Sequence, residues 1–284
     1  MSLHPRLQLL LQRPVSWMIV GVIAIVVWNA VLSIGSEVLP SLLFLLIALA
    51  GSVGMIVTYR WIMQSLANRQ PQELSAYKAG KEVVYGIIVG SLFILMSVLL
   101  IMMLGGYHLA WNTDGIQTGL VTTFAMTVAA ALAEELIFRG FIFQACEQMN
   151  GSLLAMIVTS ALFGAAHLAN PGATLWSACA IMLEAGVLLG AAFVWRRNLW
   201  FVFGLHVAWN TLENLLGIPV SGHDPAGLFQ VSSSGSHWLT GGAFGLEASL
   251  VPVAVSVLLS VPMIVLSVVK KKWMVRTLDV QNEW

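Results

Sequence analysis

The chain has 284 residues, of which 58% are hydrophobic and only 9% are charged. Soluble domains usually carry about 25% charged residues, so this composition excludes an ordinary soluble protein and indicates one surrounded by lipid. The formal net charge is zero, which gives no reason to expect a nucleic-acid partner.

Long uncharged stretches predict transmembrane helices, since a helix needs about 20 mainly apolar residues to cross a bilayer. One longer uncharged run, Gly151–Leu183, contains the turn signal Asn170-Pro171-Gly172 and therefore predicts two helices. The expected spans are Pro14–Ser36, Val38–Tyr59, Val83–Leu104, Gly115–Ala133 with a continuation, Gly151 to about His167, about Ala173 to Leu183, Asn198–Leu212 and Ala248–Val269. We therefore predict an all-α polytopic transmembrane helix bundle of about eight spans, forming a single integral-membrane domain over residues 1–284.

The positions of the basic residues test this arrangement, because cytoplasmic segments of membrane proteins carry an excess of Lys and Arg. With the N-terminus inside and eight spans, the outside segments hold Glu37, Asp114, Asp224 and Glu247 but no Lys or Arg. The inside segments hold Arg6, Arg13, Arg60, Arg69, Lys78, Lys81, Arg196, Arg197, Lys270, Lys271, Lys272 and Arg276. We therefore predict that both termini are cytoplasmic.

Ionisable side chains within predicted spans are costly in lipid and are the first candidates for a functional site. The stretch AEELIFRG, residues 133–140, contains Glu134, Glu135 and Arg139. Glu135 and Arg139 are four residues apart and share a helix face, so we expect them to form an ion pair. Glu134 points about 100° away from Glu135 around the helix, so it needs partners from other helices.

Two later spans supply polar partners. SALFGAAHLANP places Phe163 and His167 one helical turn apart, and GLHVAWNTLEN places His206 and Asn210 on one helix face. A lone buried histidine is more often a packing residue than a ligand. Histidines in two separate spans, with Asn210 one turn from the second, instead favour a shared polar site.

Three chemistries fit these residues. In the first, Glu134 is a general base that activates a water with help from His167, while His206 and Asn210 stabilise an oxyanion. In the second, Glu134, His167 and His206 bind a divalent metal such as zinc. In the third, carboxylates and histidines form the proton relay of a transporter. The sequence lacks the HExxH pattern of common soluble metalloproteases.

The three polar segments together resemble the CPBP family of intramembrane proteases, which includes CAAX-prenyl endopeptidases and bacteriocin-processing enzymes. The family motifs EExxxR, FxxxH and HxxxN are intact here as Glu134–Arg139, Phe163–His167 and His206–Asn210, in the same order on separate helices. The resemblance covers a predicted catalytic core at residues 130–222. Two further stretches, GIPVSG at 217–222 and, more loosely, TGGAFGLEASL, are similar to bacterial members.

The resemblance implies an intramembrane endopeptidase with a conical active-site cavity that is open to the cytosolic side. It implies that Glu134 activates the water, that His167 helps to hold it, and that His206 and Asn210 stabilise the oxyanion. Because these four groups already supply the donors and acceptors, we expect no cofactor. A divalent metal such as zinc, held by Glu134, His167 and His206, is the alternative.

The remaining motif residues have supporting roles by the same resemblance. Glu135 and Arg139 would form the supporting ion pair, with Arg139 a candidate to steer a substrate carboxylate, and Phe163 would pack within its motif. Outside the motifs, we expect Glu184 to be a protonated carboxyl that is hydrogen-bonded within the bundle. We expect Glu213 to lie at the membrane interface.

The expected substrate is a peptide or a membrane-associated protein, cut near its end, and the expected surroundings are the lipid bilayer. The composition favours a multi-pass protein of a bacterial plasma (inner) membrane. Three alternatives remain: a catalytically idle membrane scaffold, a bacteriocin self-immunity protein and a proton-coupled transporter.

Overall fold

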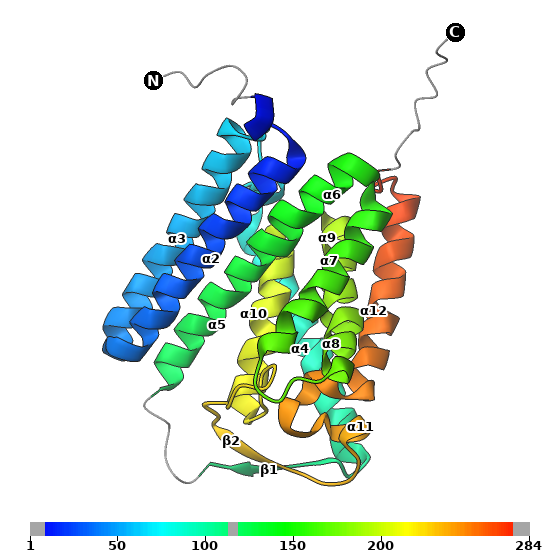
Figure 1. The fold of residues 1–284 in the computed structure, drawn as a ribbon. Coiled ribbons are helices and arrows are strands. Elements are labelled where there is room, and N and C mark those ends of the chain that lie inside the picture. Colours follow the sequence, from blue (N-terminus) through cyan, green and yellow to red (C-terminus); the bar gives the residue numbers. More distant parts are fainter. Residues whose placement is uncertain (1–8, 113–118, 275–284) are drawn as a thin grey trace.

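The computed structural model describes residues 9–112 and 119–274, so the predicted positions of Arg6, Asp114 and Arg276 lie outside the described residues. The described residues form a bundle of long helices, shown in Figure 1, which confirms the predicted all-α polytopic bundle. The long helices are α2 (Pro14–Val38), α3 (Ser41–Ser65), α4 (Ala79–Met103), α5 (Leu120–Glu135) continued by η2 (Leu136–Ile142) and α6 (Phe143–Asn150), α7 (Ser152–Ala166), α8 (Leu175–Ile181) continued by η4 (Met182–Gly186) and α9 (Val187–Arg196), α10 (Leu199–Leu216) and α12 (Leu250–Val269).

Within the described part of the chain, seven helices are long and apolar enough to cross a membrane. The remaining long helix, α10, carries His206, Asn210 and Glu213 and is therefore less apolar. The protein is an integral, multi-pass membrane protein, while the count of eight spans stays a prediction. The predicted break at Asn170-Pro171-Gly172 is confirmed, because η3 (His167–Ala169) ends the α7 segment and α8 begins only at Leu175.

One end of the bundle, which we call the cation end, carries the basic residues. Figure 1 shows that α2 begins and α12 ends there. Its described cations are Arg13, Arg60, Arg69, Lys78, Lys81, Arg196, Arg197, Lys270, Lys271 and Lys272. The opposite end, which we call the loop end, contains the segments between α4 and α5 and between α10 and α12.

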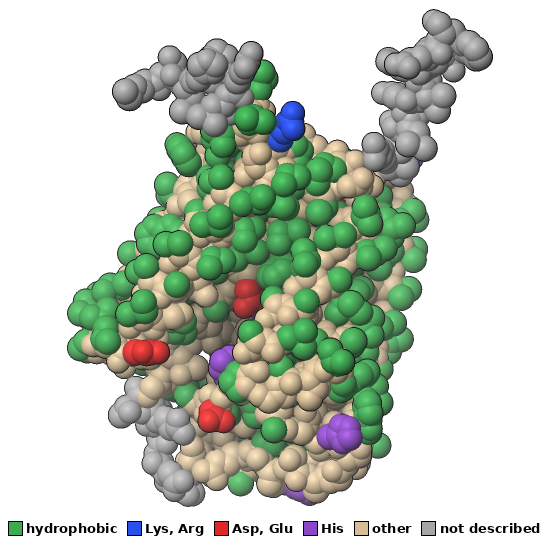
Figure 2. Space-filling view, in the orientation of Figure 1, with side chains coloured by type: hydrophobic (Ala, Val, Ile, Leu, Met, Phe, Trp, Pro, Cys, Tyr) green, Lys and Arg blue, Asp and Glu red, His purple; other side chains and the backbone are tan. Residues whose placement is uncertain are grey.

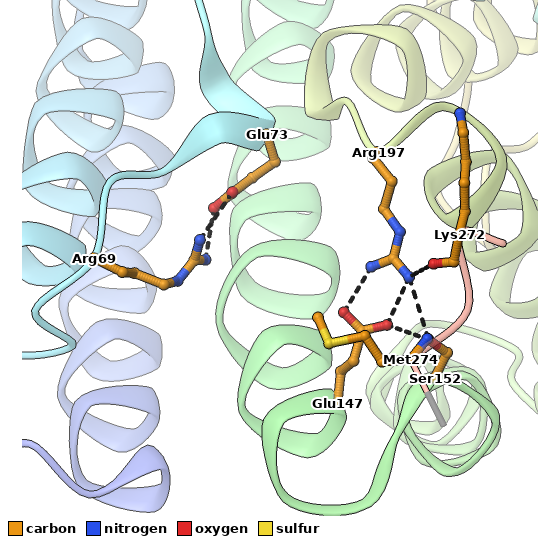
Figure 3. A network of polar contacts seen from close by, with 7 residues as sticks. All are labelled: Arg69, Glu73, Glu147, Ser152, Arg197, Lys272 and Met274. Atoms are coloured by element: carbon orange, nitrogen blue, oxygen red, sulfur yellow. Dashed lines mark hydrogen bonds and ion pairs between the residues drawn. The ribbon is translucent and has the colours of Figure 1, made fainter. Parts of the chain in front are cut away.

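Ion pairs and hydrogen bonds tie the chain together at the cation end (Figure 3). Arg197 donates to both carboxylate oxygens of Glu147, at 2.6 and 2.8 Å, and to the backbone carbonyl of Lys272. The backbone N–H of Met274 donates to the hydroxyl of Ser152 at 2.8 Å. These contacts join the α6–α7 turn, the α9–α10 turn and the segment after α12.

Two further acid–base pairs at the cation end join neighbouring segments. Arg69 contacts Glu73 at 2.8 Å between α3 and α4, close to η1 (Gln72–Leu74), as Figure 3 also shows. Arg196 binds the carboxylate of Glu82, with one hydrogen bond of 3.0 Å, and so connects α9 to α4. Ion pairs therefore connect the helix ends at this end of the bundle.

The loop end is covered by short elements that fold back over the helices. They are β1 (Tyr107–Trp111), β2 (Phe229–Ser233), α11 (His237–Thr240), η5 (Gly242–Phe244) and η6 (Leu246–Ala248). β1 and β2 pair in antiparallel fashion, with Tyr107 opposite Ser233. The expectation that Glu213 lies at the membrane interface is wrong, because its side chain is fully buried near the end of α10.

Helices α4 and α10 approach each other closely because glycine leaves their contact free of side chains. A Cβ on Gly90 would lie 2.4 Å from the carbonyl oxygen of Leu205, and one on Gly86 would lie 2.0 Å from that of Phe201. Small residues spaced four apart allow such contacts between membrane helices. This contact fixes the height and rotation of α10, which carries two motif residues.

We predict that Gly90→Ala lowers the stability of the protein in detergent by roughly 1–3 kcal/mol, because its methyl group has to displace the α10 backbone. The matched control is Gly80→Ala, also on α4, where an added Cβ meets no atom within 4 Å. It should be neutral or slightly stabilising, since alanine is the better helix former. Thermal unfolding of the two variants beside wild type measures both effects, and equal melting temperatures would contradict the close-contact account.

Candidate active site

The first motif lies on a continuous helix, Leu120–Asn150, that contains a π-helical turn. This turn, η2, spans Leu136–Ile142 and includes Arg139. π-Helical turns within α-helices are rare and occur often at functional sites. The helix also continues beyond the motif, as the sequence indicated, so that Glu134 lies about 21 Å along the axis from Leu120 at 1.5 Å per residue.

Arg139 is completely buried, and its two terminal guanidinium nitrogens have partners in the protein, whereas its Nε has no hydrogen-bond partner among the described residues. Its guanidinium contacts Glu135 Oε1 at 3.2 Å, so the expected ion pair is present in the structure. It also donates to the backbone carbonyls of Ala185 and Gly186, each at 3.2 Å, beside the second π-helical turn η4. Its Cζ lies 4.7 Å from the centre of the Phe163 ring. A side chain held in this way has no free surface with which to steer a substrate carboxylate.

His206 connects the two neighbouring glutamates of the first motif. Its Nδ1 lies 2.8 Å from Glu135 Oε1, and its Nε2 lies 3.7 Å from Glu134 Oε2. An ionised carboxylate can only accept a hydrogen bond, so Nδ1 donates to Glu135 and the ring orientation is fixed. The Glu134 side chain is 31% exposed, whereas that of Glu135 is 1% exposed. Glu134 is therefore the carboxylate that solvent or a substrate can reach.

The other motif histidine, His167, lies where α7 ends. Its Nδ1 is 2.7 Å from the backbone carbonyl oxygen of Phe163, and a carbonyl can only accept, so Nδ1 carries the proton. In the neutral ring this leaves the Nε2 lone pair free to accept a hydrogen bond from water. The rings of Phe163 and His167 are 4.8 Å apart, so Phe163 supports the imidazole as well as the Arg139 guanidinium.

A cavity of about 580 Å³ brings the motif residues together. Glu134, His167, His206 and Asn210 all line it, although they lie on three separate helical segments at different distances from their helix ends. Glu135 and Arg139 do not line the cavity, but they contact His206 and Phe163, which do. An apolar pocket of about 370 Å³ shares Thr123, Thr127 and Asn214 with this cavity.

The cavity extends from the middle of the bundle to the loop end. Its lining includes Ser36 at the end of α2, Thr122 near the start of α5, and His223 and Asp224 in the segment after α10. Figure 2 shows the surface hollowed on the face where Figure 1 places α5 and α7, with acidic and histidine side chains around the hollow. The sequence predicted both cytoplasmic termini and a cavity that is open to the cytosol. Because the cavity reaches the end of the bundle opposite to the one where α2 begins and α12 ends, these two expectations cannot both be correct.

The cavity also contains polar residues that the sequence reasoning did not assign to the site. Glu247 lines it and accepts a hydrogen bond of 2.5 Å from Ser221, and Asn170 and Asn214 line it as well. Burial raises the pKa of Glu247, and the hydrogen bond from Ser221 opposes this rise. Ser221 belongs to GIPVSG and Glu247 to TGGAFGLEASL. The similarity of these two stretches to bacterial family members is the sequence feature that could have assigned both residues to the site.

The set of donors around the cavity does not form a metal site in this structure. Among residues 9–112 and 119–274, no group of three or more His, Cys, Asp and Glu side chains is placed to hold a metal ion. Glu134, His167 and His206, which the metal alternative requires, line the same cavity but are not placed to hold a metal ion together. We therefore derive no chemical step through a metal.

Glu184 lies beside the site but takes no part in it. It is completely buried in η4, immediately before the carbonyls that bind Arg139. The hydrogen bonds expected for it within the bundle are not formed, because neither carboxyl oxygen has a hydrogen-bond partner among the described residues.

Comparison with known proteins agrees with the motifs. Residues 116–212 match the family model described as Type II CAAX prenyl endopeptidase Rce1-like. This match covers about a third of the chain and supports the resemblance to the CPBP family. The match supports a CAAX-type intramembrane protease at the family level. The matched segment contains all three motifs and overlaps the core predicted at residues 130–222. No curated protein and no solved structure matches the chain.

We predict that Arg139→Lys lowers the stability of the protein by roughly 1–3 kcal/mol, because a single ammonium group leaves buried carbonyls without donors. The control is Arg69→Lys, in another Arg–Glu pair with a spacing of four residues, whose arginine is 30% exposed. That change should cost less than about 1 kcal/mol. Melting temperatures in detergent compare the two, and equal losses would contradict a special role for the buried guanidinium.

Proposed function

We propose that the protein is an intramembrane endopeptidase in which Glu134 activates a water molecule to hydrolyse a peptide bond. The observation that carries this proposal is the shared cavity, which is lined by a partly exposed carboxylate, two histidines and an asparagine. These groups are the ones that water activation and oxyanion stabilisation require. The intact motifs and the family match support the same reaction class.

In the proposed reaction, Glu134 takes a proton from a water while the water oxygen bonds to the scissile carbonyl carbon. His167 accepts the water's second hydrogen bond through its free Nε2 and so aligns it for attack. The resulting tetrahedral oxyanion collapses, the carbon–nitrogen bond breaks, and Glu134 returns its proton to the leaving amine. One water is consumed, and the products are a new carboxyl terminus and a new amino terminus.

His206 and Asn210 are the proposed donors to the oxyanion. Because His206 Nδ1 donates to Glu135, Nε2 can donate to an oxyanion only when both ring nitrogens carry protons. The Asn210 side chain lies one helical turn further along α10 and lines the same cavity. Glu135 and Arg139 are positioning residues, since they hold the His206 ring without lining the cavity.

We expect Glu134→Gln to lower kcat for peptide hydrolysis by roughly 10²–10⁴-fold with little change in KM, because an amide cannot accept the proton from water. Glu37→Gln, an exposed glutamate at the end of α2, is the matched control and should retain wild-type activity. The readout is the set of new peptide ends in membranes that contain each variant. Cleavage by Glu134→Gln at the wild-type rate would instead favour the idle-scaffold alternative or another base.

We also expect chelators such as EDTA and 1,10-phenanthroline to leave the cleavage rate unchanged, since no three donor side chains among the described residues are placed to hold a metal ion. The purified protein in detergent or in liposomes is suited to this measurement. A loss of activity that added zinc restores would show that the metal alternative is correct.

A further inference from the structure

We infer that the active-site cavity opens on the extracytoplasmic side of the membrane, and that its substrates are membrane-anchored proteins cut near that face. This inference rests on the proposed peptidase function and adds to it the side of access and the class of substrate. It follows from two independent observations, the distribution of charge along the bundle and the direction in which the cavity opens.

The first observation is the charge asymmetry between the two ends of the bundle. Of the Lys and Arg residues in the described part of the chain, all lie at the cation end except Arg139, which is buried at the site. The described segments at the loop end contain Glu37, Asp224 and Glu247 but no Lys or Arg. The connections at the cation end are short, and short loops are those whose basic residues determine orientation. The cation end is therefore cytoplasmic.

The second observation is that the cavity reaches only the loop end. Its innermost lining residues are Phe138, Ala185 and His206, and none of its lining residues belongs to the cation end. The contacts of Arg197 and Arg196 close the opposite end. Water and substrate can therefore enter from the loop end or through the hollow between α5 and α7, but not from the cation end (Figures 1 and 2).

The lining also indicates how a substrate is held. The residues that line the cavity, all within the described chain, include Glu134, Asp224 and Glu247 but no Lys or Arg. A free C-terminal carboxylate would find no Lys or Arg side chain there and would meet three carboxyl groups of the protein. The chemistry instead suits an internal peptide bond. Because the hollow faces the space between α5 and α7, a substrate with a membrane anchor can reach it while remaining in the bilayer.

Cysteine labelling tests the side of access. Cys146 and Cys179, which are both free, are first replaced by alanine. Single cysteines are then introduced as Ala130→Cys inside the cavity, Asp224→Cys at its mouth and Ala76→Cys in the exposed loop between α3 and α4 at the cation end. A membrane-impermeant maleimide is applied to intact cells and to inside-out vesicles.

The expected result is labelling of Ala130→Cys and Asp224→Cys in intact cells, with Ala76→Cys labelled only in inside-out vesicles. Labelling of Ala130→Cys only in inside-out vesicles would overturn the inference, as would failure to label it from either side in a folded protein. If Ala130→Cys does not fold, Thr123→Cys, which lines the outer part of the same cavity, takes its place.

The new peptide ends that depend on Glu134 separate this inference from the proposed function. Ends that are lost in Glu134→Gln and map to the extracytoplasmic borders of membrane segments would support both. Ends that depend on Glu134 but map to cytoplasmic borders would overturn the inference and leave the peptidase intact. If no ends depend on Glu134, the proposed function fails whatever the labelling shows.

Discussion

A guanidinium group without access to water has to find its partners within the protein, and the partners of Arg139 relate several helices of this bundle to one another. Glu135 supplies the opposite charge, Phe163 supplies an aromatic face, and η4 brings two backbone carbonyls within reach. Glu135 also accepts the hydrogen bond from His206. One buried charge thus links the first motif to the helices that carry the other two, and the reactive groups take their positions from that link.

Glycine provides the second constraint, because it determines how near the backbones of neighbouring helices can come. The contact of α4 with α10 depends on Gly86 and Gly90, and Gly164 similarly brings α7 against α8, where its Cβ would lie 2.4 Å from the carbonyl oxygen of Ala178. These contacts fix α10 and α7, which carry the two motif histidines. In lipid, where apolar surface gains little from association, such close packing holds helices together.

Features set by local sequence could be predicted, whereas features set by distant partners could not. The spans follow from apolar length, and the Glu135–Arg139 contact follows from helical spacing. The π-helical turns contain Arg139 in η2 and its carbonyl partners Ala185 and Gly186 in η4. These partners lie 46 and 47 residues further along the chain, so local sequence could not predict the turns. Glu213 was expected at the membrane interface and Glu247 in an outside segment, but both are buried where the segment after α10 folds back over the loop end. Polarity in a sequence does not reveal such covering.

One half of the bundle contains the polar cavity and the other half is closed by ion pairs, and this division has a consequence for the membrane itself. A polar cavity that reaches the middle of a bilayer crosses half of the permeability barrier. A second opening on the other side would turn it into a channel through which ions and protons could leak. The tightly paired layer formed by Arg197, Glu147 and the segment after α12 keeps the barrier intact on the other side. In the proposed peptidase, the cavity has a single open end, so the cleaved fragments leave by the same opening through which the next substrate enters.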